Sequence, residues 1–262
     1  MFFLSRFYEL YVLMTPVEVP LYVYIIMHLL FIAPLNFFAF FLVYRTRKKP
    51  LAVRERYLKA GALAMGLVMV LRYTLYAIYV YKVHYFNSII KFEMSEIAMY
   101  LLILAIFVIK KKWFYPLAFT VGLLSCIAVI VYPYTVFSHH SPIHLYTISS
   151  ILFHVLNGYM ACMLITARGY TPRLKQIGGV LLGNVALFAI ILFANKMSGE
   201  NFMALSDASK LPIIGGTKPP VNVIIIYLVF NVMSFAVLAV SEILYRKTHK
   251  KQTKISAYAE EK

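Results

Sequence analysis

Seven apolar segments, separated by short polar ones, dominate the hydropathy pattern of the chain. They cover residues 20–44, 60–83, 94–109, 115–137, 145–167, 176–196 and 221–245. A helix needs about 20 mostly apolar residues to cross a bilayer, and only the third segment is clearly shorter. The pattern therefore predicts an all-α, polytopic membrane protein with seven transmembrane helices in one domain, 20–245. Residues 1–19 are expected to form an interfacial segment, and residues 246–262 a basic, disordered cytoplasmic tail.

The composition supports a membrane environment. Hydrophobic residues make up 62% of the chain and charged residues 14%, against about 45–50% and 25% in soluble domains. The net charge of +16 raises the question of nucleic acid, but the basic residues lie in short clusters between apolar segments. That arrangement is typical of loops facing anionic lipid headgroups. We expect a multi-pass protein of the cell membrane whose partners are membrane lipids, not nucleic acid, and which needs no cofactor.

The distribution of Lys and Arg predicts the orientation. Loops 45–59, 110–114 and 168–175 and the C-terminal tail together hold 19 of the 26 basic residues, and the alternate loops hold six. Basic loops favour the cytoplasmic side. The N-terminus is therefore expected outside and the C-terminus inside.

Four ionisable or reactive side chains interrupt the apolar segments at similar depth. At 1.5 Å per residue, they lie near one level of the bilayer: His28, Arg72, Cys126 and His154. Polar side chains at this depth usually face the protein interior and often mark functional sites. Each also has a structural alternative: Cys126 as a small buried residue, Arg72 as a charge paired with Glu96 or Glu93, and His154 as a hydrogen-bonded packing residue.

Segment 145–167 has a polar face. Small and polar residues follow helical spacing at Ser150, His154, Asn157, Gly158 and Ala161. Apolar residues that suit lipid lie on the other side: Leu152, Phe153, Val155 and Leu156. We therefore expect His154 to point inward, where an imidazole can act as a general base. A weaker stripe in segment 221–245 is typical of hydrogen bonding between helices: Asn231, Ser234, Ser241 and Glu242.

The histidines of "SHHSPIH" do not predict a metal site. His140 and His144 are four residues apart, but Pro142 between them disfavours a helix. No cysteine or acidic residue nearby completes a ligand set.

From about residue 90 to residue 240 the order of motifs resembles a known family. The motifs are "YPLAFTVGLLSCIAVIVYP", the histidine of "ILFHVLNGYM", and "NKMSGENFMAL" with Asn201. This order resembles the YwaF-like integral membrane family, whose eukaryotic relatives of the transmembrane protein 164 type are phospholipid acyltransferases. The resemblance implies a lipid acyl-transfer enzyme with a catalytic histidine, matched by His154, and a cysteine nucleophile early in the third span. In "KFEMSEIAMYL", Ile97 or Ala98 stands at the place of that cysteine.

The leading hypothesis is therefore a phospholipid acyl-transfer enzyme, or a degenerate relative without activity. In the active form His154 is the general base for an acceptor hydroxyl, and Cys126 is the possible substitute nucleophile. We expect Arg72 to hold a phosphate or carboxylate in a cavity lined by spans 1, 2, 4, 5 and 7, with further substrate contacts from Asn157, Asn201, His28 and Glu96. The alternatives are a transporter or sensor component with a polar intramembrane cavity, and a scaffold for partner proteins.

Overall fold

The computed structural model describes residues 26, 28–80, 91–131, 145–208 and 217–260, and in these ranges it contains seven α-helices and no strand. The helices are α3 (Ala33–Thr46), α4 (Leu51–Val80), α5 (Met94–Ile103), α6 (Tyr115–Val131), α8 (Leu145–Arg168), α9 (Ile177–Ser198) and α10 (Val221–Glu260). Short π and 3₁₀ turns adjoin them: η1 (His28–Ile32), η2 (Leu104–Val108), η3 (Leu174–Gln176) and η4 (Phe202–Ala204). The predicted interfacial segment 1–19 lies outside the described residues.

The all-α prediction is confirmed, and each predicted apolar segment contains one helix. Among the described residues, four helical stretches are long and apolar enough to cross a membrane: Leu29–Thr46, Thr147–Arg168, Leu174–Ser198 and Val221–Thr248. Met94–Val108 and Tyr115–Val131 are apolar but shorter. The count of seven spans and the orientation of the termini remain predictions.

Two helices extend beyond the predicted apolar segments. Helix α4 begins at Leu51 instead of residue 60, and α10 continues to Glu260, so the basic tail is helical through that residue instead of disordered. Arg, Lys and Glu are good helix formers, and Pro50 accepts the first α4 hydrogen bond, from the Arg54 N–H at 3.1 Å. Hydropathy marks where the apolar stretch ends, not where the helix ends.

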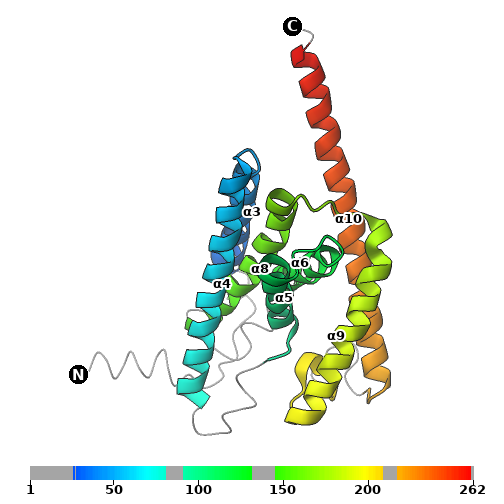
Figure 1. The fold of residues 1–262 in the computed structure, drawn as a ribbon. Helices are drawn as coiled ribbons and strands as arrows, with labels where there is room; N and C mark the ends of the chain where they lie inside the picture. Colours follow the sequence, from blue (N-terminus) through cyan, green and yellow to red (C-terminus); the bar gives the residue numbers. More distant parts are fainter. Residues whose placement is uncertain (1–25, 27, 81–90, 132–144, 209–216, 261–262) are drawn as a thin grey trace, which may run out of the picture.

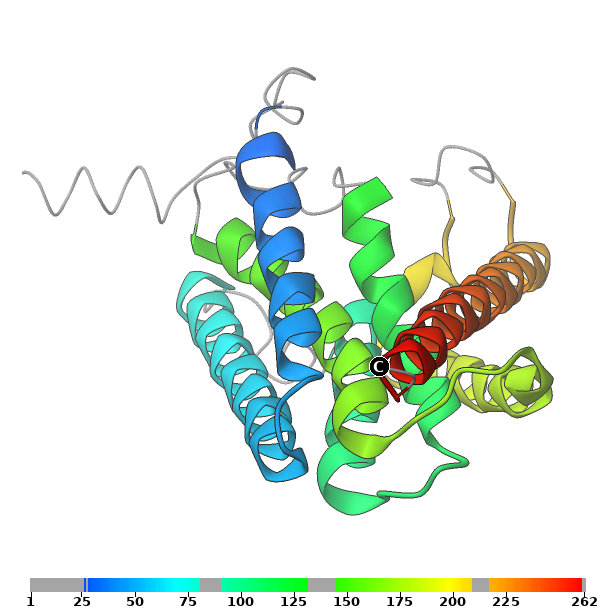
Figure 2. The same cartoon turned by 90° about the horizontal axis from the view of Figure 1, so that it is seen from above.

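Helix α8 is the centre of the bundle. It packs against α3, α4, α5 and α6, whereas α9 and α10 pack on each other and on α6 (Figures 1 and 2). Within the apolar window of α8, 67% of the residues are buried, against 22% in each of the other three candidate spans. The predicted lipid-facing side of α8 is therefore wrong in part: Phe153 and Val155 are buried. Neighbouring helices surround α8 on most sides, so its apolar residues contact protein.

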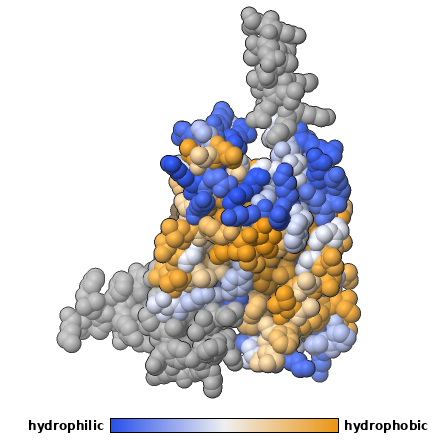
Figure 3. All heavy atoms as spheres, in the orientation of Figure 1, coloured by the Kyte–Doolittle hydropathy of each residue, from blue (hydrophilic) through white to orange (hydrophobic). Residues whose placement is uncertain are grey.

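The predicted basic segments meet at one end of the bundle, which we call the basic end. Arg54 Nη1 donates to the Thr166 carbonyl at 2.6 Å, and Arg168 lies 3.3 Å from Glu55. The Leu174 N–H donates to Glu242 Oε2 at 2.6 Å, which joins α10 to the same end. In Figure 3 this end is hydrophilic, and a hydrophobic band lies below it. These contacts bring loops 45–59 and 168–175 and helix α10 to one end, and the side of the membrane on which this end lies remains a prediction.

Glycine allows α6 and α8 to approach closely. An added Cβ at Gly158 would lie 2.6 Å from Cys126 Sγ and 2.8 Å from its Cβ. A Cβ at Gly122 would lie 3.1 Å from the Cβ of Ala161. Small residues at such contacts are characteristic of helix packing in membranes.

Gly158→Ala is expected to destabilise the protein by about 1–3 kcal/mol, the usual cost of overpacking, because Cys126 Cβ is fixed by the α6 backbone. The matched control is Gly66→Ala, where nothing lies within 4 Å of the added Cβ. Thermal unfolding in detergent should show a lower melting temperature for the first variant only. Equal melting temperatures would contradict this close contact.

Candidate functional site

His154 of α8 is held by α6 through one ring nitrogen. Its Nδ1 lies 2.7 Å from the Ser125 carbonyl oxygen and 3.0 Å from Ser125 Oγ. A carbonyl only accepts, so Nδ1 carries the proton in the neutral ring. Nε2 then holds the lone pair, and it makes no hydrogen bond within the described part of the chain. The half-buried imidazole is thus oriented as a potential base at Nε2.

Asn157, one turn along α8, joins α5 and α6. Its Nδ2 donates to the Ser95 carbonyl at 3.0 Å and to Ser125 Oγ at 3.1 Å. Its Oδ1 is buried and has no hydrogen-bond partner among the described residues. An unbonded buried acceptor costs free energy, so this oxygen suits a donor from water or a substrate.

Arg72 of α4 forms a buried ion pair with Glu96 of α5. The Nη1–Oε1 distance is 3.0 Å, and both side chains are at least nine-tenths buried. Ser95 Oγ donates to the other carboxylate oxygen at 2.8 Å, and the Arg72 guanidinium lies 5.1 Å from the centre of the Phe153 ring. The pairing of Arg72 with Glu96, one of the sequence alternatives, is therefore present.

The remaining predicted residues occupy different places. Cys126 is buried, and its thiol donates to Asn36 Oδ1 of α3 at 3.0 Å instead of bonding His154. The backbone of His28 lies in η1, but its side chain is outside the described residues. The structure therefore brings together His154, Asn157, Arg72 and Glu96.

Asn201 shapes the loop after α9. Its Oδ1 accepts from the Ser206 and Asp207 N–H groups, and its Nδ2 donates to the Asp207 carbonyl at 2.7 Å. The loop reaches the start of α5, where the Met203 N–H donates to Glu93 Oε2 at 3.1 Å. Glu93 precedes Glu96 by one turn, so this loop lies at the end of α5 nearest the ion pair.

Met203 and Ala204 adopt left-handed backbone conformations, with φ of 54° and 55°. Such conformations cost non-glycine residues about 1–3 kcal/mol each. They persist here in a loop tied down by side-chain hydrogen bonds, including that of Asn195 Nδ2 to the Phe202 carbonyl at 3.1 Å.

Sequence reasoning missed Ser125 and Ser95, the residues that connect the site. Ser125 directly precedes Cys126, and Ser95 directly precedes Glu96, so each adjoined a residue already selected. Their partners are on other helices, which one sequence does not reveal. The span-7 prediction holds in part: Asn184 of α9 donates to Asn231 at 2.9 Å and Ser234 at 3.3 Å.

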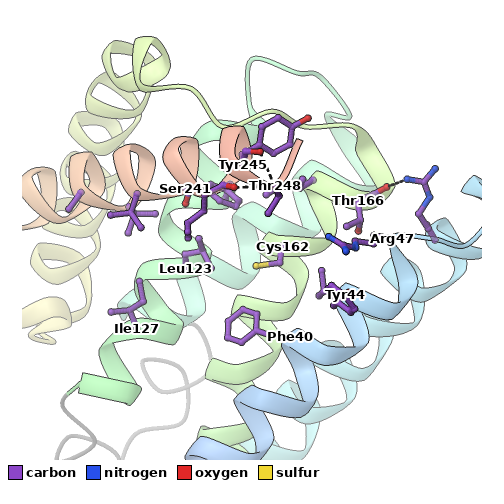
Figure 4. A pocket seen from close by; sticks show the side chains of 18 of the residues that line it. Phe40, Tyr44, Arg47, Leu123, Ile127, Cys162, Thr166, Ser241, Tyr245 and Thr248 are labelled. Atoms are coloured by element: carbon purple, nitrogen blue, oxygen red, sulfur yellow. Dashed lines mark hydrogen bonds between the residues drawn. The ribbon is translucent and has the colours of Figure 1, made fainter. Parts of the chain in front are cut away.

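A second feature is a cavity of about 770 Å³ near the basic end. It is lined by α3, α6, α8 and α10 and, before the predicted segment 60–83, by Arg54 of α4. Four of the five segments predicted to enclose a cavity therefore contribute to its lining, and segment 60–83 does not. The lining residues are mostly apolar, and of the polar residues named from the sequence only Ser241 is among the described residues of the lining. Figure 4 shows Phe40, Cys162 and Leu123 around it.

Within the described residues, no group of three His, Cys, Asp or Glu side chains could hold a metal ion. His139, His140 and His144 lie outside the described residues.

In a comparison with known families, a family model described as the TMEM164 family matches residues 15–240. No curated protein and no solved structure matches the chain. The matched region begins well before residue 90, where the resemblance in sequence motifs starts. The YwaF-like part of that resemblance remains a prediction.

Arg72→Met is expected to destabilise the protein by about 3–5 kcal/mol, because it leaves Glu96 charged and buried without its partner. The double variant Arg72→Met/Glu96→Leu should recover much of this loss. Thermal unfolding of wild type, both single variants and the double variant forms a double-mutant cycle. Additive effects would show that the ion pair contributes no coupling.

Proposed function

This chain belongs to the TMEM164 family of membrane proteins, and we propose that it transfers acyl chains between phospholipids with His154 as general base. The proposal includes a multi-pass location in the cell membrane with lipids as partners. The observation that carries it is the hydrogen bond from His154 Nδ1–H to the Ser125 carbonyl. That bond fixes the tautomer and leaves the Nε2 lone pair for a proton.

The proposed reaction is direct acyl transfer. Nε2 of His154 takes the proton of a hydroxyl group on the acceptor lysolipid. At the same time the oxygen of that hydroxyl attacks the ester carbonyl of the donor phospholipid. The tetrahedral adduct collapses, the bond to the donor's glycerol oxygen breaks, and that oxygen takes the proton from Nε2–H. One ester forms, one breaks, and the imidazole returns to its neutral state.

No side chain that we place in the site is a better nucleophile than the hydroxyl oxygen of the acceptor lysolipid. Ile97 and Ala98, at the place of the family cysteine, are 5% and 0% exposed and have no nucleophilic atom. The Cys126 thiol bonds Asn36. Ser125 Oγ faces Nδ1, the protonated nitrogen, and therefore lacks a base. A reaction without an acyl-enzyme follows from this arrangement.

Arg72 and Asn157 have different roles in the proposed site. Glu96 already neutralises Arg72, so we assign the pair to holding α4 against α5; Arg72 meets a phosphate or carboxylate only when substrate displaces Glu96. Asn157 Oδ1 can accept from a substrate hydroxyl. Asn201 acts indirectly, by holding the loop that contacts Glu93.

The missing cysteine favours a second candidate, a non-catalytic relative that binds or passes a lipid or small solute. In that case the same polar residues line a binding site and His154 transfers no proton. The two candidates differ in whether acyl groups move between lipids.

The deciding experiment is acyl exchange by the purified protein in nanodiscs, with labelled phospholipid donor and lysophospholipid acceptor. His154→Ala is expected to abolish transfer but to keep the fold, since hydrogen bonds between membrane helices average about 0.6 kcal/mol. The matched control is Asn231→Ala, which loses a hydrogen bond between α9 and α10 and should retain transfer.

Cys126→Ser is expected to retain most of the transfer activity, because the Cys126 thiol bonds Asn36 and not His154. Loss of transfer activity in this variant would indicate that Cys126 is the nucleophile. Absence of transfer by folded wild-type protein would reject the enzyme and favour lipid or solute binding.

A further inference from the structure

The cavity near the basic end differs in chemistry from the His154 site. Both lie along α8, but Cys162 is about 12 Å further along the helix axis than His154. Cys162, Ile165 and Thr166 line the cavity. We propose that it binds one anionic phospholipid, with an acyl chain in its apolar part and the phosphate beside the cations at its rim. This proposal does not depend on acyl transfer.

The apolar part suits an acyl chain. Side chains from four helices line it, including Phe40 of α3, Leu123 of α6, Ile165 of α8 and Val237 of α10. The volume of about 770 Å³ falls within the range of about 300–1,000 Å³ typical of ligand pockets. A free phosphate ion would leave this surface uncovered, so the lining favours an amphiphile.

Of the residues that the structure describes, three cations and no carboxylate line the same cavity: Arg47, Lys48 and Arg54. The Arg47 guanidinium lies 4.0 Å from the centre of the Tyr44 ring, which orients it. Arg54 Nη1 is fixed by the Thr166 carbonyl at 2.6 Å. The Nε atoms of Arg47 and Arg54 are buried without a hydrogen-bond partner among the described residues. The positive charge of the rim is therefore not neutralised by the lining.

This charge selects among lipids. A phosphate can accept two parallel hydrogen bonds from a guanidinium, and basic pockets between membrane helices bind anionic headgroups. A zwitterionic headgroup would also bring an ammonium group, for which the lining has no acidic partner, and the Tyr44 ring is already covered by Arg47. On the α10 side, Ser241 and Thr248 also line the cavity (Figure 4). Their hydroxyl groups suit the glycerol and ester region.

The test is photocrosslinking of the full chain in phosphatidylcholine nanodiscs. Each nanodisc sample contains a trace of one photoreactive probe, either phosphatidate or phosphatidylcholine, and both probes carry a diazirine in one acyl chain. Peptide mapping should place phosphatidate adducts on lining residues such as Leu123 and Val237. We expect about tenfold more of them than with phosphatidylcholine, the ratio that one charge-assisted hydrogen bond supplies. Equal labelling by the two lipids, or adducts spread over the outer surface, would overturn the proposal.

Matched variants separate the cavity from general attraction to basic surface. Arg47→Gln/Lys48→Gln should remove the preference for phosphatidate, whereas Arg56→Gln, an exposed cation outside the lining, should keep it. Ala236→Trp should fill the cavity and abolish the adducts, whereas Val232→Trp, at a position 67% exposed and outside the lining, should not.

Two further arms complete the test. Added inorganic phosphate should not compete; competition would identify a phosphate site without an acyl chain and reject the lipid assignment. His154→Ala should retain the adducts, so failure of acyl transfer and failure of lipid binding can be told apart. Loss of the adducts in this variant would overturn the independence of the two sites.

Discussion

The close contact between α6 and α8 is the constraint on which the other contacts of the site depend. Lipid tails are as apolar as leucine, so packing and hydrogen bonds, not the hydrophobic effect, hold membrane helices together. Gly122 and Gly158 remove the side chains that would separate these two helices. Only at this separation does the Ser125 carbonyl come within 2.7 Å of His154. At the same contact Cys126 packs directly against Gly158. The hydrogen-bond partner of His154 is therefore Ser125 and not Cys126.

From this contact a polar network extends through the bundle, and it accounts for how the apolar interior contains two full charges. Asn157 connects α8 to α5, and Glu96 on α5 neutralises Arg72 on α4. A charge buried without a partner is strongly unfavourable, whereas a hydrogen-bonded pair is tolerated. The cations of the cavity rim are not neutralised in this way. No carboxylate among the described residues lines their cavity, and at the basic end they can reach the headgroup region. One helix, α8, thus adjoins a neutralised polar site and a cationic, mostly apolar cavity.

The sequence predicted features that lie within one helix and missed those that depend on two. The stripe from Ser150 to Ala161 faces inward as expected, because polar residues avoid lipid and helical spacing places them on one side. Phe153 was assigned to lipid wrongly, since an aromatic ring suits lipid and protein interior equally. Ser125 could not be recognised as the partner of His154, because its role follows from the register between α6 and α8. The sequence predicted a cavity lined by polar residues, and the mostly apolar lining of the cavity at the basic end escaped prediction, because hydropathy does not indicate which helix faces adjoin a cavity.

The hydrogen bonds of His154 bear on whether it is a packing residue or a base. Buried polar atoms are usually hydrogen-bonded. The Asn184 side chain is a packing residue whose Nδ2 donates to Asn231 and Ser234 across one helix interface, while its buried Oδ1 has no partner among the described residues. His154 is bonded on one nitrogen only: Ser125 holds Nδ1, while Nε2 makes no bond in the described part of the chain and the ring stays half-buried. A ring fixed at one nitrogen and available at the other has the arrangement that proton transfer requires. Asn157 and the Arg72–Glu96 pair lie on the same network as His154, so a substrate at Nε2 would also meet these polar groups. The loop held by Asn201 lies at the start of α5, next to this network.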